Sequence, residues 1–202
     1  MRNILLLTVL PAALLVSCAT EMTGPYHPAT PPEKVELDRA RLNVYPEDVR
    51  KDLPAYAAMH VAWAGIIVTN NATEDEASGK IHMATLFDNH YFDWEQKGRG
   101  PDAKLAISPR GEGLFRMNWN LSRKKEDASQ TDAMKYAAPG NLAIVYGTPL
   151  SIGTDGMIDL RYHYIRVLDL DQFTTNELDY GRMGEPVRPI ATPRAAGPSP
   201  IR

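Results

Sequence analysis

Apolar and polar residues alternate along several segments in the middle of the chain, and this pattern predicts a domain made mainly of β-strands. Alternation with a period of two is typical of strands that bury one face. The first predicted strand, HVAWAGIIVT, is identified instead by its β-branched and aromatic residues. It contains Gly65, which predicts a bulge or a bend. The predicted strands are 60–69, 80–93, 114–119, 142–147, 150–152 and 158–168.

The last predicted strand carries apolar residues on both faces near its end, as expected where a sheet closes on itself. A strong hairpin signal, Asp155-Gly156, precedes it. One face is predicted to hold Ile158, Leu160, Tyr162, Tyr164 and Arg166, and the other Asp159, Arg161, His163, Ile165 and Val167. About five strands, with a polar insertion between the third and fourth, predict a small, OB-like, partly closed β-barrel. A β-sandwich is the alternative.

The segments between the strands predict turns and short helices. Residues 70–79 are polar and predict a turn, and residues 98–101 predict a loop. The charged segment 122–138 predicts a short helix. Residues 170–180 predict another short helix, which would cover one end of the barrel.

An apolar run near the start of the chain, Ile4–Val16, follows the single positive charge of Arg2. The run is shorter than the ~20 residues that a transmembrane helix needs, but it has the length of a signal-peptide core. The segment LVSC at 15–18 closes it and resembles the lipobox of bacterial lipoprotein signal peptides. This resemblance implies cleavage after residue 17 and lipidation of Cys18. The alternative is a plain secretory signal.

Lipidation of Cys18 would place the protein in the cell envelope and attach it to a membrane. Two or more acyl chains hold a protein stably on a membrane, which would then be a partner of this chain. Because Cys18 is the only cysteine, its modification would exclude a disulfide, a cysteine nucleophile and a thiolate metal site. Residue 19 is Ala rather than Asp, which favours the outer membrane in Gram-negative sorting.

Proline-rich segments flank the predicted barrel. Residues 18–45 contain four prolines among small polar residues and predict an extended tether, with a short helical turn at 36–44. Residues 181–202 combine five prolines with four arginines and one acid, which predicts a disordered basic tail. Such a tail favours contact with an anionic envelope polymer or lipid headgroups. The predicted barrel domain covers residues 46–180.

Overall charge argues against a nucleic-acid partner. The chain has 202 residues, with 22 Lys and Arg against 25 Asp and Glu, giving a formal net charge of −3. Nucleic-acid binding calls for clustered basic residues. The length fits one domain with tails.

Histidines and carboxylates that lie near one another in the sequence suggest a metal site. His82 and His90 lie close to Asp88 and Asp93 in the sequence, and His163 lies on a later strand. Imidazole and carboxylate groups bind Zn²⁺. However, two histidines eight residues apart in a regular strand are separated by ~26 Å. We therefore expect solvent-facing histidines and predict neither a metal nor another cofactor.

Sequence signals for catalysis are weak. The chain has no Gly-x-Ser-x-Gly elbow and no glycine pattern that opens a phosphate-binding loop. Its acidic runs, such as residues 74–76 and 126–127, are typical of solvated loops. The sequence therefore predicts a protein that is not an enzyme.

Aromatic residues are the best candidates for ligand contact. Trp94, Trp119, Tyr162 and Tyr164 fall on segments that are plausible neighbours in a barrel. OB barrels bind ligands on one face and the adjoining loops. The alternative, which the high apolar area of these side chains favours, is that they form the core.

Several short motifs together resemble one family. They are the lipobox, the strand Val61-x-Trp63-x-Gly65-Ile66-Ile67, and the late segment IVYGT at 144–148 followed by Tyr162-x-Tyr164. They resemble the Slp family of outer-membrane lipoproteins, which are small envelope proteins associated with starvation or stationary phase. The resemblance implies an OB-like barrel and no enzymatic activity.

The predicted function follows from the anchor and this resemblance. We expect a lipoprotein of the cell outer membrane, anchored through Cys18, with a non-enzymatic structural or stress-related role in the envelope. The alternative is a periplasm-facing module that binds a ligand or an envelope protein, such as an accessory subunit or assembly factor of an envelope complex.

Overall fold

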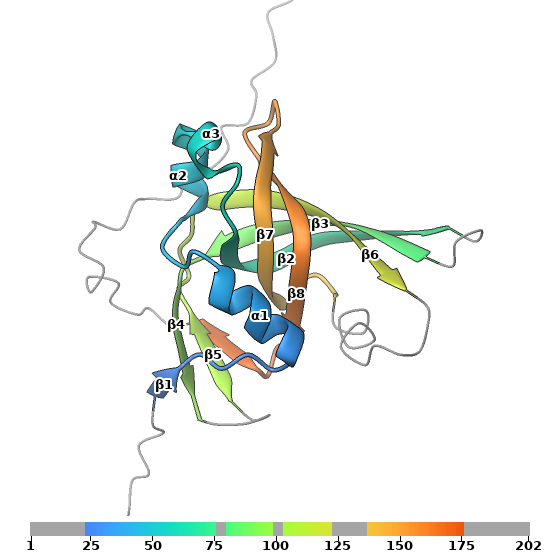
Figure 1. The fold of residues 1–202 in the computed structure, drawn as a ribbon. Helices are drawn as coiled ribbons and strands as arrows, with labels where there is room; N and C mark the ends of the chain where they lie inside the picture. Colours follow the sequence, from blue (N-terminus) through green and yellow to red (C-terminus); the bar gives the residue numbers. More distant parts are fainter. Residues whose placement is uncertain (1–22, 76–79, 99–102, 123–136, 176–202) are drawn as a thin grey trace, which may run out of the picture.

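Five long strands close into a barrel in the computed structural model of the chain, which describes residues 23–75, 80–98, 103–122 and 137–175 (Figure 1). Around the barrel the order is β2-β3-β6-β8-β7. Neighbouring strands are antiparallel except β6 and β8, which are parallel. This arrangement confirms the OB-like prediction and excludes the sandwich. The strands are β2 (Val61–Asp75), β3 (Lys80–His90), β6 (Gly113–Ser122), β7 (Leu142–Ile152) and β8 (Ile158–Leu168).

The barrel strands differ from the predicted segments mainly at their ends. Strand β2 continues through the predicted turn to Asp75 because it stays paired with β3 as far as Asp75↔Lys80. This long hairpin extends beyond the barrel (Figure 1). The segments 142–147 and 150–152 form one strand, β7. The Asp155-Gly156 turn is confirmed, since Gly156 adopts a φ of 76° between β7 and β8.

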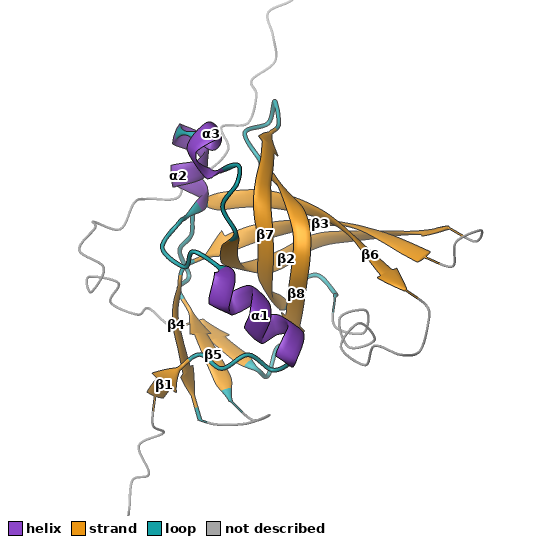
Figure 2. Ribbon diagram, in the orientation of Figure 1, coloured by secondary structure: helices purple, strands orange, loops and turns teal. Residues whose placement is uncertain are grey.

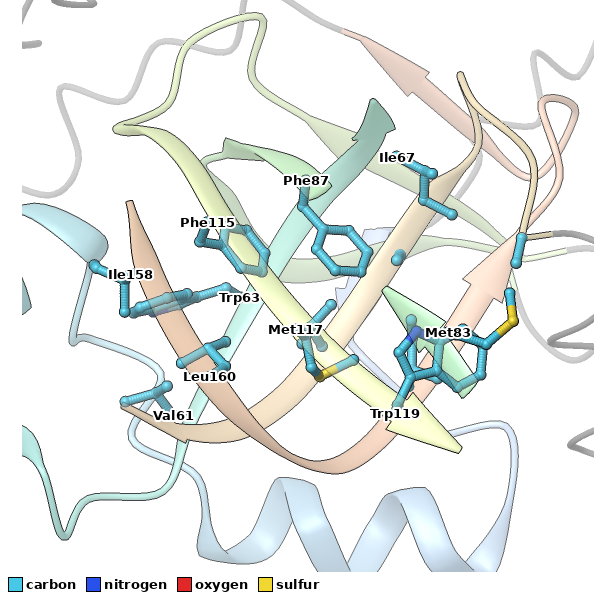
Figure 3. Packing of buried hydrophobic residues seen from close by; sticks show 14 of the residues in the cluster. Val61, Trp63, Ile67, Met83, Phe87, Phe115, Met117, Trp119, Ile158 and Leu160 are labelled. Atoms are coloured by element: carbon cyan, nitrogen blue, oxygen red, sulfur yellow. The ribbon is translucent and has the colours of Figure 1, made fainter. Parts of the chain in front are cut away.

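The barrel interior is filled by apolar side chains from all five strands (Figure 3). The ring of Phe115 stacks on Phe87 at 4.9 Å and meets the edge of Trp63 at 5.2 Å. Gly65 makes room for these rings, because a Cβ there would lie 3.0 Å from the Cβ of Phe87 and 3.1 Å from Phe115. The bulge in β2 falls at Val68, between the paired residues Ile67 and Thr69.

A second sheet, which the sequence analysis did not predict, forms a second core with the outer side of the barrel wall. Its order is β1-β4-β5-β9. Side chains such as Ala62, Ile144 and Leu168 face this core from β2, β7 and β8. Residues 173–175 form a strand rather than the helix predicted for 170–180. The strands are β1 (Thr23–Pro25), β4 (Phe92–Lys97), β5 (Lys104–Ile107) and β9 (Phe173–Thr175).

The described part of the predicted tether is folded onto the barrel, so an extended chain over 18–45 is wrong for residues 23–45. Helix α1 (Pro31–Arg39) lies against β8, and α2 (Pro46–Lys51) and α3 (Leu53–Tyr56) follow it (Figure 2). Two prolines occupy the first positions of α1, where a missing N–H costs nothing. The Thr30 hydroxyl caps the helix by accepting from the Glu33 amide at 3.2 Å.

A bulge in β8 changes which residues face the barrel interior. Tyr146 pairs with Tyr164 and Gly147 with Tyr162, so His163 is the extra residue. Ile158 and Leu160 point into the barrel before the bulge, and Ile165 does so after it. The predicted single face running from Ile158 through Tyr164 to Arg166 is therefore wrong beyond the bulge.

Several predictions concern residues outside the described ranges. These are the signal peptide at 1–17, the lipidated Cys18, the tail at 181–202 and the helix over 123–136. Ser122 itself belongs to β6. Among the described helices, none has the length and apolar character needed to cross a membrane.

Candidate functional site

A groove of about 440 Å³ runs along the seam between β6 and β8. Among the described residues these strands pair only from Phe115↔Ile158 to Asn118↔Arg161. The groove is lined by Arg116, Asn118, Trp119, Asn120, Leu150, Asp159, Leu160, Arg161 and Tyr162. Two of the four aromatic residues predicted to contact a ligand therefore lie at one site.

Trp119 and Tyr162 form the aromatic part of the groove. Their rings lie 6.1 Å apart and are nearly parallel, at 26°. Trp119 is only 2% exposed, and its indole N–H donates to the Thr85 hydroxyl at 2.8 Å. Tyr162 is half-buried. Trp119 thus belongs mainly to the core, as the sequence analysis favoured, and Tyr162 offers the more accessible ring.

Polar side chains make the rim of the groove. Arg116 donates to Asp159 at 2.9 Å and to Asp155 at 3.0 Å, and hydrogen bonding to Asp159 is the main cause that raises the pKa of Arg116. The positive charge of Arg116 is therefore balanced by these two carboxylates. Asn118 and Arg161, which pair across the seam, are both exposed. The rim thus offers amide and guanidinium groups with little net charge.

The other two predicted aromatic residues lie in the second core. Trp94 meets the edge of Tyr26 at 5.6 Å, and Tyr164 shares a hydrogen bond of 2.9 Å with Thr30. Trp94 adopts a φ of 58°, which is unusual for a residue with a side chain. The four residues therefore do not form one site: two line the groove, and two help to hold the N-terminal segment.

A fully buried carboxylate, Glu33, organises the contact between α1 and the barrel. It accepts hydrogen bonds from the Tyr26 hydroxyl, from the Tyr146 hydroxyl at 3.2 Å and from the Ala29 amide at 2.7 Å. The Arg166 guanidinium lies 3.9 Å away and donates to the Tyr26 oxygen at 2.9 Å. The sequence analysis missed this network because nothing in the local pattern marks Glu33 as buried.

Burial is the main cause that raises the pKa of both Tyr26 and Tyr146, and the charge of Glu33 adds to it. Both hydroxyls therefore keep their protons at neutral pH and act as donors to the carboxylate. Such a network, with every polar group paired, fixes one arrangement of α1 on the barrel. We assign it a structural role.

Of the three histidines considered in the sequence analysis, His82 and His163 are exposed, as expected, whereas His90 is partly buried. The Nδ1 atom of His82 lies 2.5 Å from the Asn120 side chain, whereas that of His90 lies 2.7 Å from the Ser108 carbonyl oxygen. Within the described chain His163 joins neither of them; its ring lies 4.5 Å from that of His60. Burial is the main cause that lowers the pKa of His60, and the nearby His163 adds to the effect.

Comparisons with known proteins identify no family. No protein-family model matches the chain. No curated protein matches it either. One similar solved structure is an OBody bound to hen egg-white lysozyme, at 10% identity and a TM-score of 0.33, with 64% of this chain and 96% of that chain covered.

Proposed function

We propose that this chain is a lipid-anchored, non-enzymatic binding protein of the cell outer membrane, and that the groove between β6 and β8 binds glycan strands of the cell envelope. The observation that carries this proposal is the groove itself. It combines a half-buried aromatic ring with exposed amide and guanidinium groups on adjoining strands.

The chemistry of the groove favours a sugar over other ligands. Sugars present hydroxyl groups in the plane of the ring and C–H groups on its face, which amides and aromatic rings contact well. OB barrels use comparable surfaces for oligosaccharides and oligonucleotides. Arg116 is paired with Asp155 and Asp159, which leaves Arg161 as a single basic group in the groove. Together with the net charge of −3, this disfavours an oligonucleotide, because its phosphates need clustered basic groups.

The anchor in this proposal rests on the lipobox-like sequence that ends at Cys18. Strand β1 begins at Thr23, so the chain between them spans at most ~18 Å. A lipid on Cys18 would therefore keep the barrel close to the membrane surface, facing the periplasm. An envelope polymer is the ligand most readily within reach of a barrel in that position.

Binding to purified peptidoglycan sacculi tests the proposal. The lipidated full-length protein in detergent would be sedimented with sacculi over a range of concentrations. The groove variant carries both Asn118→Ala and Arg161→Ala, which removes two exposed groove side chains. The control variant carries both Asn71→Ala and Arg110→Ala, because these two residues are exposed and do not line the groove.

We expect the groove variant to bind sacculi at least about tenfold more weakly, since one hydrogen bond to a charged group contributes ~1.5–3 kcal/mol. The control should stay within about twofold of the unmodified protein. Absence of binding to sacculi, or equal binding by both variants, would refute glycan recognition by the groove.

A non-enzymatic structural role under envelope stress is the second candidate. It is supported by the resemblance to the Slp family and by the burial of Trp119, which leaves only part of the aromatic cluster accessible. An accessory subunit or assembly factor of an envelope complex would use the same exposed rim for a protein partner.

A further inference from the structure

Three potential metal ligands from separate parts of the chain converge beside α1. They are Glu36 on α1, His60 just before β2 and His163 at the bulge of β8. One ligand atom from each lies within 4.8 Å of the other two. Glu36 and His60 are partly buried, whereas His163 is exposed. In this metal-ligand cluster, Glu36 and His60 are therefore partly shielded from solvent, and His163 is accessible to it.

Hydrogen bonds and a β-bulge hold His60 and His163 in their positions. The His60 carbonyl oxygen accepts from the Arg41 amide at 2.7 Å, next to a bridge between Arg41 and Val61. His163 owes its direction to the bulge, a feature that often re-aims a side chain near a functional site. The Thr148 hydroxyl lies 2.8 Å from Nε2 of His163 and orients its ring. Histidine ligands of metals commonly have such a partner on the second ring nitrogen.

Two ligand atoms in the cluster lack a hydrogen bond. Oε2 of Glu36 and Nε2 of His60 lie 2.9 Å apart and form an ion pair when His60 is protonated. Both atoms are buried, and neither forms a hydrogen bond of acceptable geometry. Buried polar atoms are nearly always satisfied, so this pair calls for an explanation. A cation placed between a carboxylate oxygen and an imidazole nitrogen would satisfy both atoms at once.

We propose that Glu36, His60 and His163 bind a Zn²⁺ ion. Two imidazoles and one carboxylate are a known three-ligand set for zinc, with a fourth position left for water. Tetrahedral bonds of ~2.0–2.2 Å place ligand atoms ~3.3 Å apart. The Glu36–His60 separation is 2.9 Å and no separation in the cluster exceeds 4.8 Å, so side-chain movements of at most about 1.5 Å reach this geometry.

The donor set selects against the common alkaline-earth ions. Ca²⁺ and Mg²⁺ prefer six or more oxygen ligands, whereas this cluster offers two nitrogens and one carboxylate. Arg39, whose charge acts on His60, opposes the binding of a cation and should limit the affinity. Bound Zn²⁺ would join α1 to the start of β2 and to β8, and so would stabilise the docked helix.

Zinc titration of the full-length protein tests this proposal. The protein would be purified in detergent with a tag that contains no histidine, stripped with a chelator, and titrated calorimetrically with Zn²⁺ in excess Mg²⁺. His163→Ala removes an exposed ligand, and Glu36→Gln keeps the side-chain shape but removes the charge. His82→Ala is the matched control, since His82 is exposed and lies outside the cluster.

We expect one Zn²⁺ per chain, at least about tenfold weaker binding by both cluster variants, and unchanged binding by His82→Ala. At the same zinc concentration, Zn²⁺ should raise the melting temperature of the unmodified protein and of the control more than that of His163→Ala. Circular dichroism would confirm that each variant is folded. No stoichiometric binding, or binding that survives both cluster variants, would overturn the proposal.

Discussion

Replacement of Glu33 by Ala should destabilise the protein by about 3 kcal/mol. Loss of one member of a buried ion pair usually costs ~3–5 kcal/mol. Arg166 is 18% exposed and keeps its bonds to Tyr26 and to the His27 carbonyl oxygen, which places the cost at the low end of this range. Glu33→Gln should cost less, about 1–2 kcal/mol, because its amide oxygen still accepts from a tyrosine.

Urea unfolding of the full-length protein, followed by tryptophan fluorescence, would measure these costs. With a slope of ~2 kcal/mol per molar urea, 3 kcal/mol lowers the midpoint by ~1.5 M. Asp38→Asn is the matched control on the same helix, since within the described part of the chain Asp38 forms only an exposed pair with Lys34 at 2.8 Å. Such pairs contribute ~0.5 kcal/mol or less.

A change below about 1 kcal/mol for Glu33→Ala, or one equal to that of the control, would refute the reasoning. It would mean that water replaces the carboxylate at little cost and that the network does not hold α1 in place. A double-mutant cycle with Arg166→Met separates the pair from the tyrosine bonds. If the coupling energy between Glu33 and Arg166 is well below the destabilisation caused by Glu33→Ala, most of that destabilisation comes from the lost hydrogen bonds to Tyr26 and Tyr146.

Two further outcomes follow from the buried tyrosines and from the leader. Burial raises the pKa of Tyr26 and Tyr146 above 10.0, so above that pH the folded state holds protons that the unfolded state has lost, and stability should fall as the pH rises. Tyrosinate absorbance should show that Tyr26 and Tyr146 ionise only as circular dichroism reports unfolding; their ionisation in the folded protein would contradict this. The membrane-bound chain should have the mass expected for cleavage before Cys18 plus acyl chains, and Cys18→Ala should leave the outer-membrane fraction; an unlipidated, soluble chain would rule out the anchor.

The barrel was predictable from the sequence because its wall strands are long and rich in β-branched and aromatic residues, and because β3 and the first half of β8 alternate between buried and more exposed positions. The second sheet was not, because its strands are short and their pairing is interrupted. The register shifts between Phe92 and Gln96, and Trp94 in this stretch has a positive φ. Neither feature leaves a period of two that a sequence pattern can detect.

The prolines of the N-terminal segment and the neighbours of His163 could not be interpreted from the sequence for different reasons. Pro31 and Pro32 fit an extended tether or the first turn of a helix equally well, and the cap on Thr30 decides for the helix. His163 was expected to face solvent like the other sheet histidines, and it is exposed, but its sequence position did not link it to another metal ligand. Its actual neighbours, His60 and Glu36, reach it through a tertiary contact that sequence spacing cannot show.

The bulge at His163 connects the groove to the helix contact. Before it, Asp159 and Arg161 face outward and line the groove. After it, the outward positions are Tyr164 and Arg166, which contact the N-terminal segment. Because side chains alternate along a strand, one residue fewer at this point would turn Arg166 into the barrel and expose Ile165. The extra residue therefore allows a single strand to present a polar groove at one end and a docking surface at the other, with a metal ligand at the junction.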